Sequence, residues 1–324
     1  MGIFDKRINY KPFEYPEVLD FIDNINRTFW VHSEVDFTAD TQDFHSLLNE
    51  KEKQAIKKSL LAIAQIEVAV KSFWGNLYNH MPKPEFNGLG STFAECEFRH
   101  SEAYSRLLSV LGYDDDFEHI IEVPAIKKRL DYLEEALQHT KSDDNKKYVF
   151  SLILFSILIE NVSLFSQFAI VLSFTRFKGL MKNVSNIISW TSIDEQVHAS
   201  AGVFIVNKIK EEYPEFFDAE SKEEIKRIVE HSISVESEIL DWIFEDGEIE
   251  TISKENLLHF MKFRVDESLE EIGLSKIYHI STEQYRPMAW FEEEIFANSL
   301  DDFFAKRPTE YTKHDKSISA ADLF

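Results

Sequence analysis

Apolar side chains recur at intervals of three and four residues through most of the chain, the spacing that places them on one face of an α-helix. After an irregular arm over residues 1–15, the first such pattern follows Pro16, a residue type favoured at the start of helices. Longer patterns follow in seven further stretches: 49–80, 91–111, 123–140, 148–174, 179–213, 221–245 and 253–276. No convincing run alternates apolar and polar residues with the period of a strand. The sequence therefore predicts an all-α protein.

Prolines and glycines predict where several of these helices end. A group of four lies between the first two of the longer stretches: Pro82, Pro84, Gly88 and Gly90. We expect the prolines to end the earlier helix and the glycines to form a turn before the helix over 91–111. Gly112 fits the end of that helix. The stretch 123–140 is rich in charged residues, Arg129 among them, so we expect this helix at the surface.

Composition supports long helices and excludes several classes of protein. The 324 residues include only 9 Gly and 8 Pro, whereas average usage is about 7% and 5%. The formal net charge of −23 would repel a phosphate backbone, so we expect no nucleic-acid binding. Cys96 is the single cysteine, which rules out a disulfide framework and favours a cytoplasmic protein. The N-terminal residues lack the apolar segment of a secretion signal.

The stretch 148–174 is apolar almost throughout and long enough to span a bilayer. Glu160 lies near its centre, however, and a carboxylate there costs a few kcal/mol in lipid. We therefore expect no membrane span, and interpret the stretch as a helix buried on all sides within a large bundle.

Two segments share a spacing that suits a metal ion. They read Glu97-Phe98-Arg99-His100 and Glu195-Gln196-Val197-His198. Positions i and i+3 lie on one face of a helix, so a carboxylate oxygen and an imidazole nitrogen can bind the same ion. One such motif arises often by chance, whereas two on separate long helices are a stronger indication.

Two further helices each place an acid within an apolar run, namely Glu67 and Glu160. A buried carboxylate needs a cation, a proton or strong hydrogen bonds. One Glu from each of two helices and Glu-x-x-His from each of two others is the ligand set of ferritin-like di-iron and di-manganese proteins. The structural alternative is that Lys71, Arg99 or Arg176 pairs with these acids and that the histidines simply satisfy polar groups of the core.

Three segments resemble the small, radical-generating subunit of class I ribonucleotide reductase. Residues 97–104, Glu-Phe-Arg-His-Ser-Glu-Ala-Tyr, are similar to its Glu-x-x-His-x-x-x-Tyr motif, and residues 194–198 to its Asp-Glu-x-x-His motif. Trp30, followed by Glu34-Val35-Asp36, resembles its Trp-x-x-x-Glu-x-Asp segment. The resemblance implies a ferritin-like helical bundle with additional flanking helices. We expect a di-metal domain over residues 1–305 and a flexible tail over 306–324.

The resemblance also implies roles for individual residues. Six would bind the two metal ions: Glu67, Glu97, His100, Glu160, Glu195 and His198. Tyr104 occupies the position of the radical tyrosine. Trp30 and Asp194, with the metal-bound His100, match the start of the radical path. Tyr311 matches the tyrosine that passes the radical to the large subunit.

The implied function is that of the small subunit of an aerobic ribonucleoside-diphosphate reductase. A dinuclear metal centre would generate the oxidant that forms a cysteine thiyl radical in the large subunit. Ribonucleotide reduction also needs a reducing cysteine pair, which a chain with Cys96 alone lacks. The family further implies a homodimer that docks on the large subunit through its C-terminal tail.

One position departs from the tyrosyl-radical members, which commonly have Asp where this chain has Glu67. Glu is similar to subgroups with a manganese/iron or dimanganese centre. Lys71, one helical turn after Glu67, could hydrogen-bond Tyr104 or attract an anionic oxidant; the alternative is an ordinary salt bridge. We expect two manganese ions as the cofactor, with two iron ions or a manganese/iron pair as alternatives.

Two other functions remain open for the same bundle. A stand-alone di-metal oxidase or oxygenase would need a substrate channel and no partner. A ferritin-like metal store would give Trp30 and Asp194 no purpose.

Overall fold

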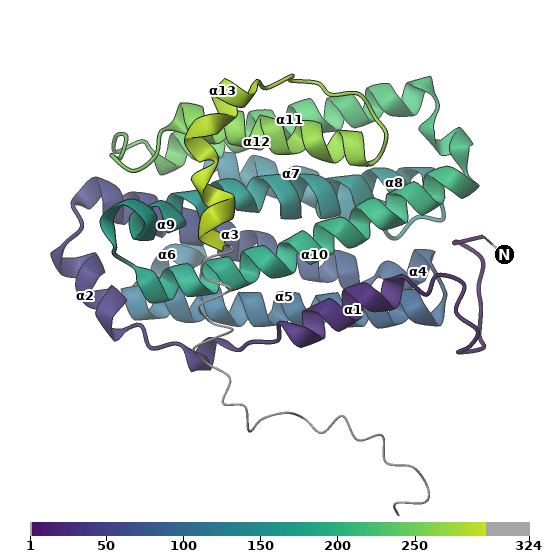
Figure 1. Ribbon diagram of the computed structural model, residues 1–324, viewed down its shortest axis with the longest axis horizontal. Helices are drawn as coiled ribbons and strands as arrows, with labels where there is room; N and C mark the ends of the chain where they lie inside the picture. Colours follow the sequence, from purple (N-terminus) through teal and green to yellow (C-terminus); the bar gives the residue numbers. More distant parts are fainter. Residues whose placement is uncertain (1, 296–324) are drawn as a thin grey trace, which may run out of the picture.

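The structure is a computed structural model that describes residues 2–295, and its described part is built of helices without a strand (Figure 1). The longer helices are α1 Val18–Arg27, α2 Thr38–Ser46, α3 Glu50–Gly75, α5 Pro84–Leu111, α7 Pro124–His139, α8 Asn145–Leu152, α9 Leu164–Lys178, α10 Lys182–Glu212, α11 Ala219–Ile243 and α12 Lys254–Glu271. Short helices are α4 Leu77–His80, α6 Asp114–His119 and α13 Thr282–Tyr285, and short 3-10 turns are η1 His32–Glu34, η2 Ile120–Glu122, η4 Pro214–Phe217 and η5 Arg286–Met288. An 11-residue π-helix, η3 Ile153–Ser163, joins α8 to α9. The all-α prediction is confirmed.

Four long segments form the central bundle: α3, α5, η3 with α9, and α10. α3 packs along α5, and α10 packs against η3 and α9, while α3 also contacts α9. The remaining helices cover this bundle, with α1 on α5 and α10, α7 on α3, and α11 and α12 at the top of the view, where α11 contacts α3 and α12 contacts η3 (Figure 1). The bundle thus surrounds one extended apolar core, and each of the four segments contributes a face to it.

α3 shows why a central helix starts where it does. The Asn49 side chain accepts a hydrogen bond from the Glu52 backbone N–H at 3.2 Å, and the Glu52 carboxylate accepts one from Asn49 N–H at 3.1 Å. This capping box satisfies two backbone donors at the helix start. The helix ends at Gly75, and α4 is a separate short turn, so the expected continuous helix to residue 80 is interrupted.

The predicted turn at Gly88 and Gly90 is wrong. Pro84 is the first residue of α5, where a missing N–H costs nothing, and the helix continues through both glycines to Leu111. A Cβ atom on Gly90 would lie 2.6 Å from the Trp74 carbonyl oxygen and 3.0 Å from the Leu77 Cβ. Gly90 therefore allows α5 to approach the end of α3 closely. Gly112 does end the helix, in the left-handed conformation with φ +83°.

The apolar stretch is a core segment, as expected. Residues Asn145–Lys178 are long and apolar enough to cross a membrane, but 89% of the most apolar window is buried against the other helices. The buried helix changes from α-helical to π-helical geometry within this stretch, because η3 occupies 11 residues of it. A π-helix bonds each N–H to the carbonyl five residues earlier, as Leu164 N–H does to Ile159. No simple sequence signal marks such a segment.

α7 is less exposed than its charge suggested. Lys127, Lys128 and Asp131 are exposed, but Arg129 is fully buried. Its guanidinium donates to the Ala62 carbonyl at 2.6 Å and lies 3.5 Å from the Glu236 carboxylate. The helix therefore covers the bundle with its exposed charged face, while the Arg129 side chain extends into the core.

Candidate metal centre

Six buried side chains meet at the centre of the bundle. Glu67 comes from α3, and Glu160 from η3, while α5 and α10 each supply a Glu-x-x-His pair. All six are at most 1% exposed: Glu67, Glu97, His100, Glu160, Glu195 and His198. The structure thus brings together every residue that the sequence suggested as a metal ligand.

Their ligand atoms fall into two overlapping groups, each with atoms within 4.8 Å of one another. One group is Glu67, Glu97, His100 and Glu195, and the other is Glu97, Glu160, Glu195 and His198. Glu97 and Glu195 belong to both. Each group therefore has one histidine and one carboxylate of its own, and the two shared carboxylates can bridge a pair of ions.

The Nδ1 atoms of both histidines point at the shared carboxylates. His198 Nδ1 lies 2.8 Å from Glu97 Oε1 and 3.1 Å from Glu195 Oε2. His100 Nδ1 lies 3.2 Å from Glu195 Oε1 and 3.3 Å from Glu97 Oε2. The i,i+3 spacing puts each histidine beside the glutamate of its own helix. The packing of α5 on α10 also brings each histidine beside the glutamate of the other helix.

The unsatisfied atoms of this cluster indicate a need for cations. Both oxygens of Glu67 and one oxygen of Glu160 are buried without a hydrogen-bond partner among the described residues. Burial and the nearby Glu97 raise the pKa of Glu67, and burial raises the pKa of Glu160 to about 8. When all four carboxylates are ionised they carry four negative charges, which two divalent ions would balance.

The arginine and lysine side chains that could have neutralised these acids lie elsewhere. Arg99 pairs with Glu95 at 3.0 Å, and Arg176 Nη2 lies 3.0 Å from the Glu293 carboxylate. The Lys71 ammonium lies 5.7 Å from the centre of the Phe98 ring. The salt-bridge alternative therefore finds no support in the described structure, and carboxylate with imidazole is a donor set that suits iron or manganese.

A hydrogen-bonded chain leads from the cluster toward Trp30. The far nitrogen of His100, Nε2, lies 3.2 Å from Asp194 Oδ2, and Trp30 Nε1–H donates to the same oxygen at 2.9 Å. The Trp30 and His100 rings are stacked with their centroids 5.7 Å apart. The structure thus joins Trp30, Asp194 and His100.

Comparison with known proteins decides the family. Residues 7–287 match the family "Ribonucleotide reductase, small chain". The chain belongs to this family. The resemblance seen in the sequence is confirmed at family level, and with it the oxidoreductase class; a stand-alone oxygenase or a metal store is not favoured.

Curated relatives cover nearly the whole chain. A probable ribonucleoside-diphosphate reductase small subunit of Invertebrate iridescent virus 3 is 26% identical over 326 residues, spanning 95% of this chain and 85% of the relative. The ribonucleoside-diphosphate reductase subunit beta of Chlamydia pneumoniae is 27% identical over 300 residues, spanning 87% and 83%.

Solved structures of the family share the fold. The R2 subunit of ribonucleotide reductase from Clostridium botulinum aligns with a TM-score of 0.82 at 19% identity, over 91% of this chain and 94% of that one. The dimanganese(II) NrdF of Streptococcus sanguinis aligns with a TM-score of 0.76 at 17% identity, over 91% and 99%. The ferritin-like bundle is therefore confirmed.

Three further residues are predicted to take part in radical chemistry: Tyr104, Lys71 and Tyr311. Tyr104 is fully buried. Burial and the charge of Glu67 raise the pKa of Tyr104, which favours the neutral phenol. Lys71 shows neither a hydrogen bond nor an ion pair to Tyr104 or the glutamates in the described part. Tyr311 and the tail over 306–324 lie outside the described residues.

Sequence reasoning missed two neighbours of the site. Trp74 Nε1–H donates to Glu160 Oε1 at 2.5 Å; it lies seven residues after Glu67, a spacing that shares a helix face. Cys96 Sγ lies 3.4 Å from Asp194 Oδ2 and 3.6 Å from His100 Nε2, one turn before His100. Helical spacing from a proposed ligand was the available signal for both.

Proposed function

We propose that this chain is the radical-generating subunit of an aerobic ribonucleoside-diphosphate reductase and that its six clustered side chains hold two divalent metal ions. The observation that carries the proposal is the sharing of Glu97 and Glu195 between two ligand groups, because it fits a bridged pair better than two separate ions. When bound, such a pair supplies the one-electron oxidant. Glu67 and Glu160 would each complete one end of the site.

The protein's own residues would then provide the electron path. Asp194 accepts from Trp30 and faces His100 Nε2, so it fixes both rings and links them by hydrogen bonds. His100 has its other nitrogen toward the cluster, so one imidazole connects the metal position to Asp194. We propose that Trp30 passes an electron to the metal site and takes one from the tail residue Tyr311. Tyr311 would in turn take an electron from the large subunit.

The large subunit would carry the substrate chemistry. Cys96 is the single cysteine of this chain, and its side chain is buried beside Asp194. It cannot supply both a substrate radical and a reducing pair. We therefore propose that a cysteine of the large subunit becomes the thiyl radical, that the tail over 306–324 docks there, and that the small subunit works as a soluble, cytoplasmic homodimer.

For the metal we propose two manganese ions, with the oxidised pair rather than Tyr104 as the working oxidant. The support is Glu67 in place of the aspartate of tyrosyl-radical members. Lys71 adds no support, since its ammonium lies over Phe98. Loading the protein with manganese alone and with iron alone, followed by electron paramagnetic resonance, tests this. A stable tyrosyl radical on the iron form that is lost in Tyr104→Phe would overturn it.

The function itself is tested by reconstitution with a purified large subunit. We expect dCDP from CDP only when metal-loaded small subunit, large subunit and reductant are all present. Tyr311→Phe should keep two metals per chain and lose turnover. Full turnover in Tyr311→Phe would remove that residue from the path, and product formation without the large subunit would overturn the assignment.

A further inference from the structure

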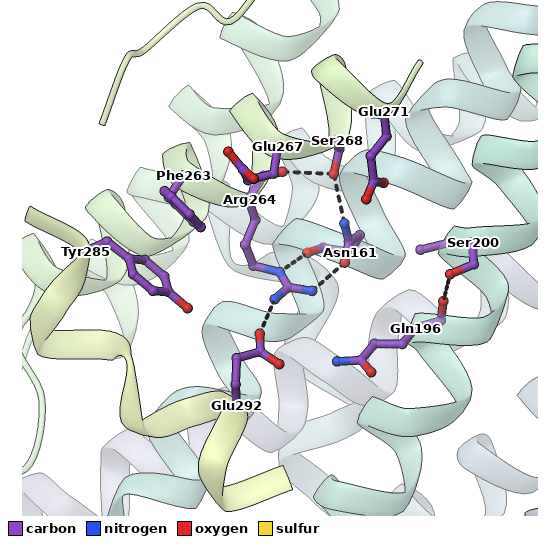
Figure 2. Close-up of a pocket in the computed structure, with 11 residues that line it drawn as sticks. Asn161, Gln196, Ser200, Phe263, Arg264, Glu267, Ser268, Glu271, Tyr285 and Glu292 are labelled. Atoms are coloured by element: carbon purple, nitrogen blue, oxygen red, sulfur yellow. Dashed lines mark hydrogen bonds and ion pairs between the residues drawn. The ribbon is translucent and has the colours of Figure 1, made fainter. Parts of the chain in front are cut away.

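A polar pocket of about 310 Å³ lies beside the turn of η3 that carries Glu160 (Figure 2). Its lining includes Asn161, which follows Glu160, and Gln196, which follows Glu195. On the opposite wall α12 contributes Arg264 and Ser268. The pocket therefore shows which side chains support the metal-binding turn from outside.

Arg264 holds Asn161 by both its backbone and its side chain. Its Nε–H donates to the Asn161 carbonyl at 2.5 Å, and its Nη2–H donates to Asn161 Oδ1. Its Nη1 lies 3.0 Å from Glu292 Oε1, so the charge of the guanidinium is balanced on the side away from η3. Asn161 Nδ2 donates in turn to Ser268 Oγ at 2.8 Å. Figure 2 shows Arg264 and Ser268 both meeting Asn161, and Arg264 also meeting Glu292 on a separate segment.

The same guanidinium also covers the end of the π-helix. It lies 3.8 Å from the centre of the Phe165 ring, and Phe165 is the second residue of α9. Arg264 thus touches the chain on both sides of the junction at Ser163 and Leu164, where π-helical geometry returns to α-helical. Because its planar fork makes several contacts in fixed directions, lysine cannot reproduce them.

A π-helix of this length needs such support. Its hydrogen-bond pattern is rare, and it occurs mostly as single turns within α-helices, frequently at functional sites. If the segment reverted to α-helical spacing, each side chain beyond the change would rotate about the axis. Glu160 lies one residue before Asn161, so its carboxylate would leave the cluster.

We propose that Arg264 is a positioning residue that holds η3 in its π-helical form and so keeps Glu160 at one end of the metal site. The inference rests on the proposed metal function. It assigns Arg264 to one metal position only, because Glu160 belongs to the ligand group with His198 and not to the group with Glu67.

The test is a titration of the full-length, metal-free protein with Mn²⁺ alone, in which free Mn²⁺ is measured by electron paramagnetic resonance. We expect Arg264→Lys to bind one ion like the wild type and the second about tenfold more weakly, the usual effect of losing a residue that orients a ligand. Glu160→Gln should weaken the binding of the same second ion. Arg176→Lys is the matched control, because Arg176 pairs with Glu293, next to Glu292, and no hydrogen bond or ion pair joins it to η3 within residues 2–295.

A second measurement separates positioning from general destabilisation. Hydrogen exchange of the metal-free protein should accelerate in residues 153–163 of Arg264→Lys and not in α3 or α5. Asn161→Ala, which keeps the carbonyl acceptor, should show a smaller change in the same segment. Unchanged hydrogen exchange in residues 153–163 of Arg264→Lys, or equally weakened binding of both ions, would overturn the role of Arg264. Failure of the wild type to bind two ions would instead overturn the proposed function.

Discussion

Removing the metals should reverse the pH dependence of stability. In the metal-free protein burial raises the pKa of Glu160 from its ordinary 4.5 to about 8. Between these pH values the native state holds a proton that the unfolded chain releases, so stability falls as pH rises. Glu67 acts in the same direction, since burial and Glu97 raise its pKa. His100 and His198 act in the same direction, because their pKa values are raised despite burial. Their contribution to stability is therefore present below pH 6.5 and is lost at higher pH.

The magnitude follows from the proton affinity. A rise of the Glu160 pKa from 4.5 to about 8 corresponds to about 5 kcal/mol across that pH interval, at roughly 1.36 kcal/mol for each tenfold change in proton affinity. It would lower the melting temperature by roughly 10 °C, at about 2 °C per kcal/mol for a chain of this size.

Calorimetry from pH 4.5 to 8.5 measures the effect in chelator-treated and manganese-loaded protein. We expect the melting temperature of the metal-free form to fall with pH and that of the loaded form to hold or rise, because ions replace the protons on the ligands. Glu160→Gln removes one titrating group and should flatten the metal-free curve. Equal slopes for the two forms, or a metal-free slope that Glu160→Gln leaves unchanged, would refute the reasoning.

Three further predictions follow from single contacts. Gly90→Ala places a Cβ 2.6 Å from the Trp74 carbonyl oxygen and should cost about 1–3 kcal/mol in denaturant unfolding, whereas the control Gly75→Ala, with its nearest atom at 3.8 Å, should be tolerated. Trp30→Phe removes the donor to Asp194 but no metal ligand, so metal content should stay at two ions while turnover with the large subunit falls at least a hundredfold; wild-type turnover would exclude Trp30 from the path. Lys71→Gln should leave metal content and the manganese resonance spectrum unchanged, since the ammonium lies over Phe98, and altered spectra would show that it acts on the centre.

Local rules accounted for the helical class and the six proposed ligands. The i,i+3 spacing of Glu97 with His100, and of Glu195 with His198, is a property of any α-helix and could be read from the chain. Glu67 and Glu160 were visible because a carboxylate within an apolar run must have a partner. The family motifs then connected Tyr104, Trp30 and Asp194 to the same centre.

Errors arose where packing overrode local preference. Glycine often marks a turn, but at Gly90 the approach of α5 to Trp74 requires a residue without a Cβ. Arg129 has charged neighbours that are typical of a surface helix, yet it enters the core to meet Ala62 and Glu236. Lys71 shares the helical turn after Glu67, but its long side chain extends toward Phe98.

The sequence by itself determined that the chain is a helical bundle with two Glu-x-x-His helices and two buried acids, because helical period and the cost of burying charge act within a few residues. Only the tertiary structure decided that Glu97 and Glu195 are shared between two ligand groups, that Glu160 sits on a π-helix, and that Arg264 supports it. These depend on distances between helices far apart in the chain. Such distances are set by the packing of the whole core, which no local pattern encodes.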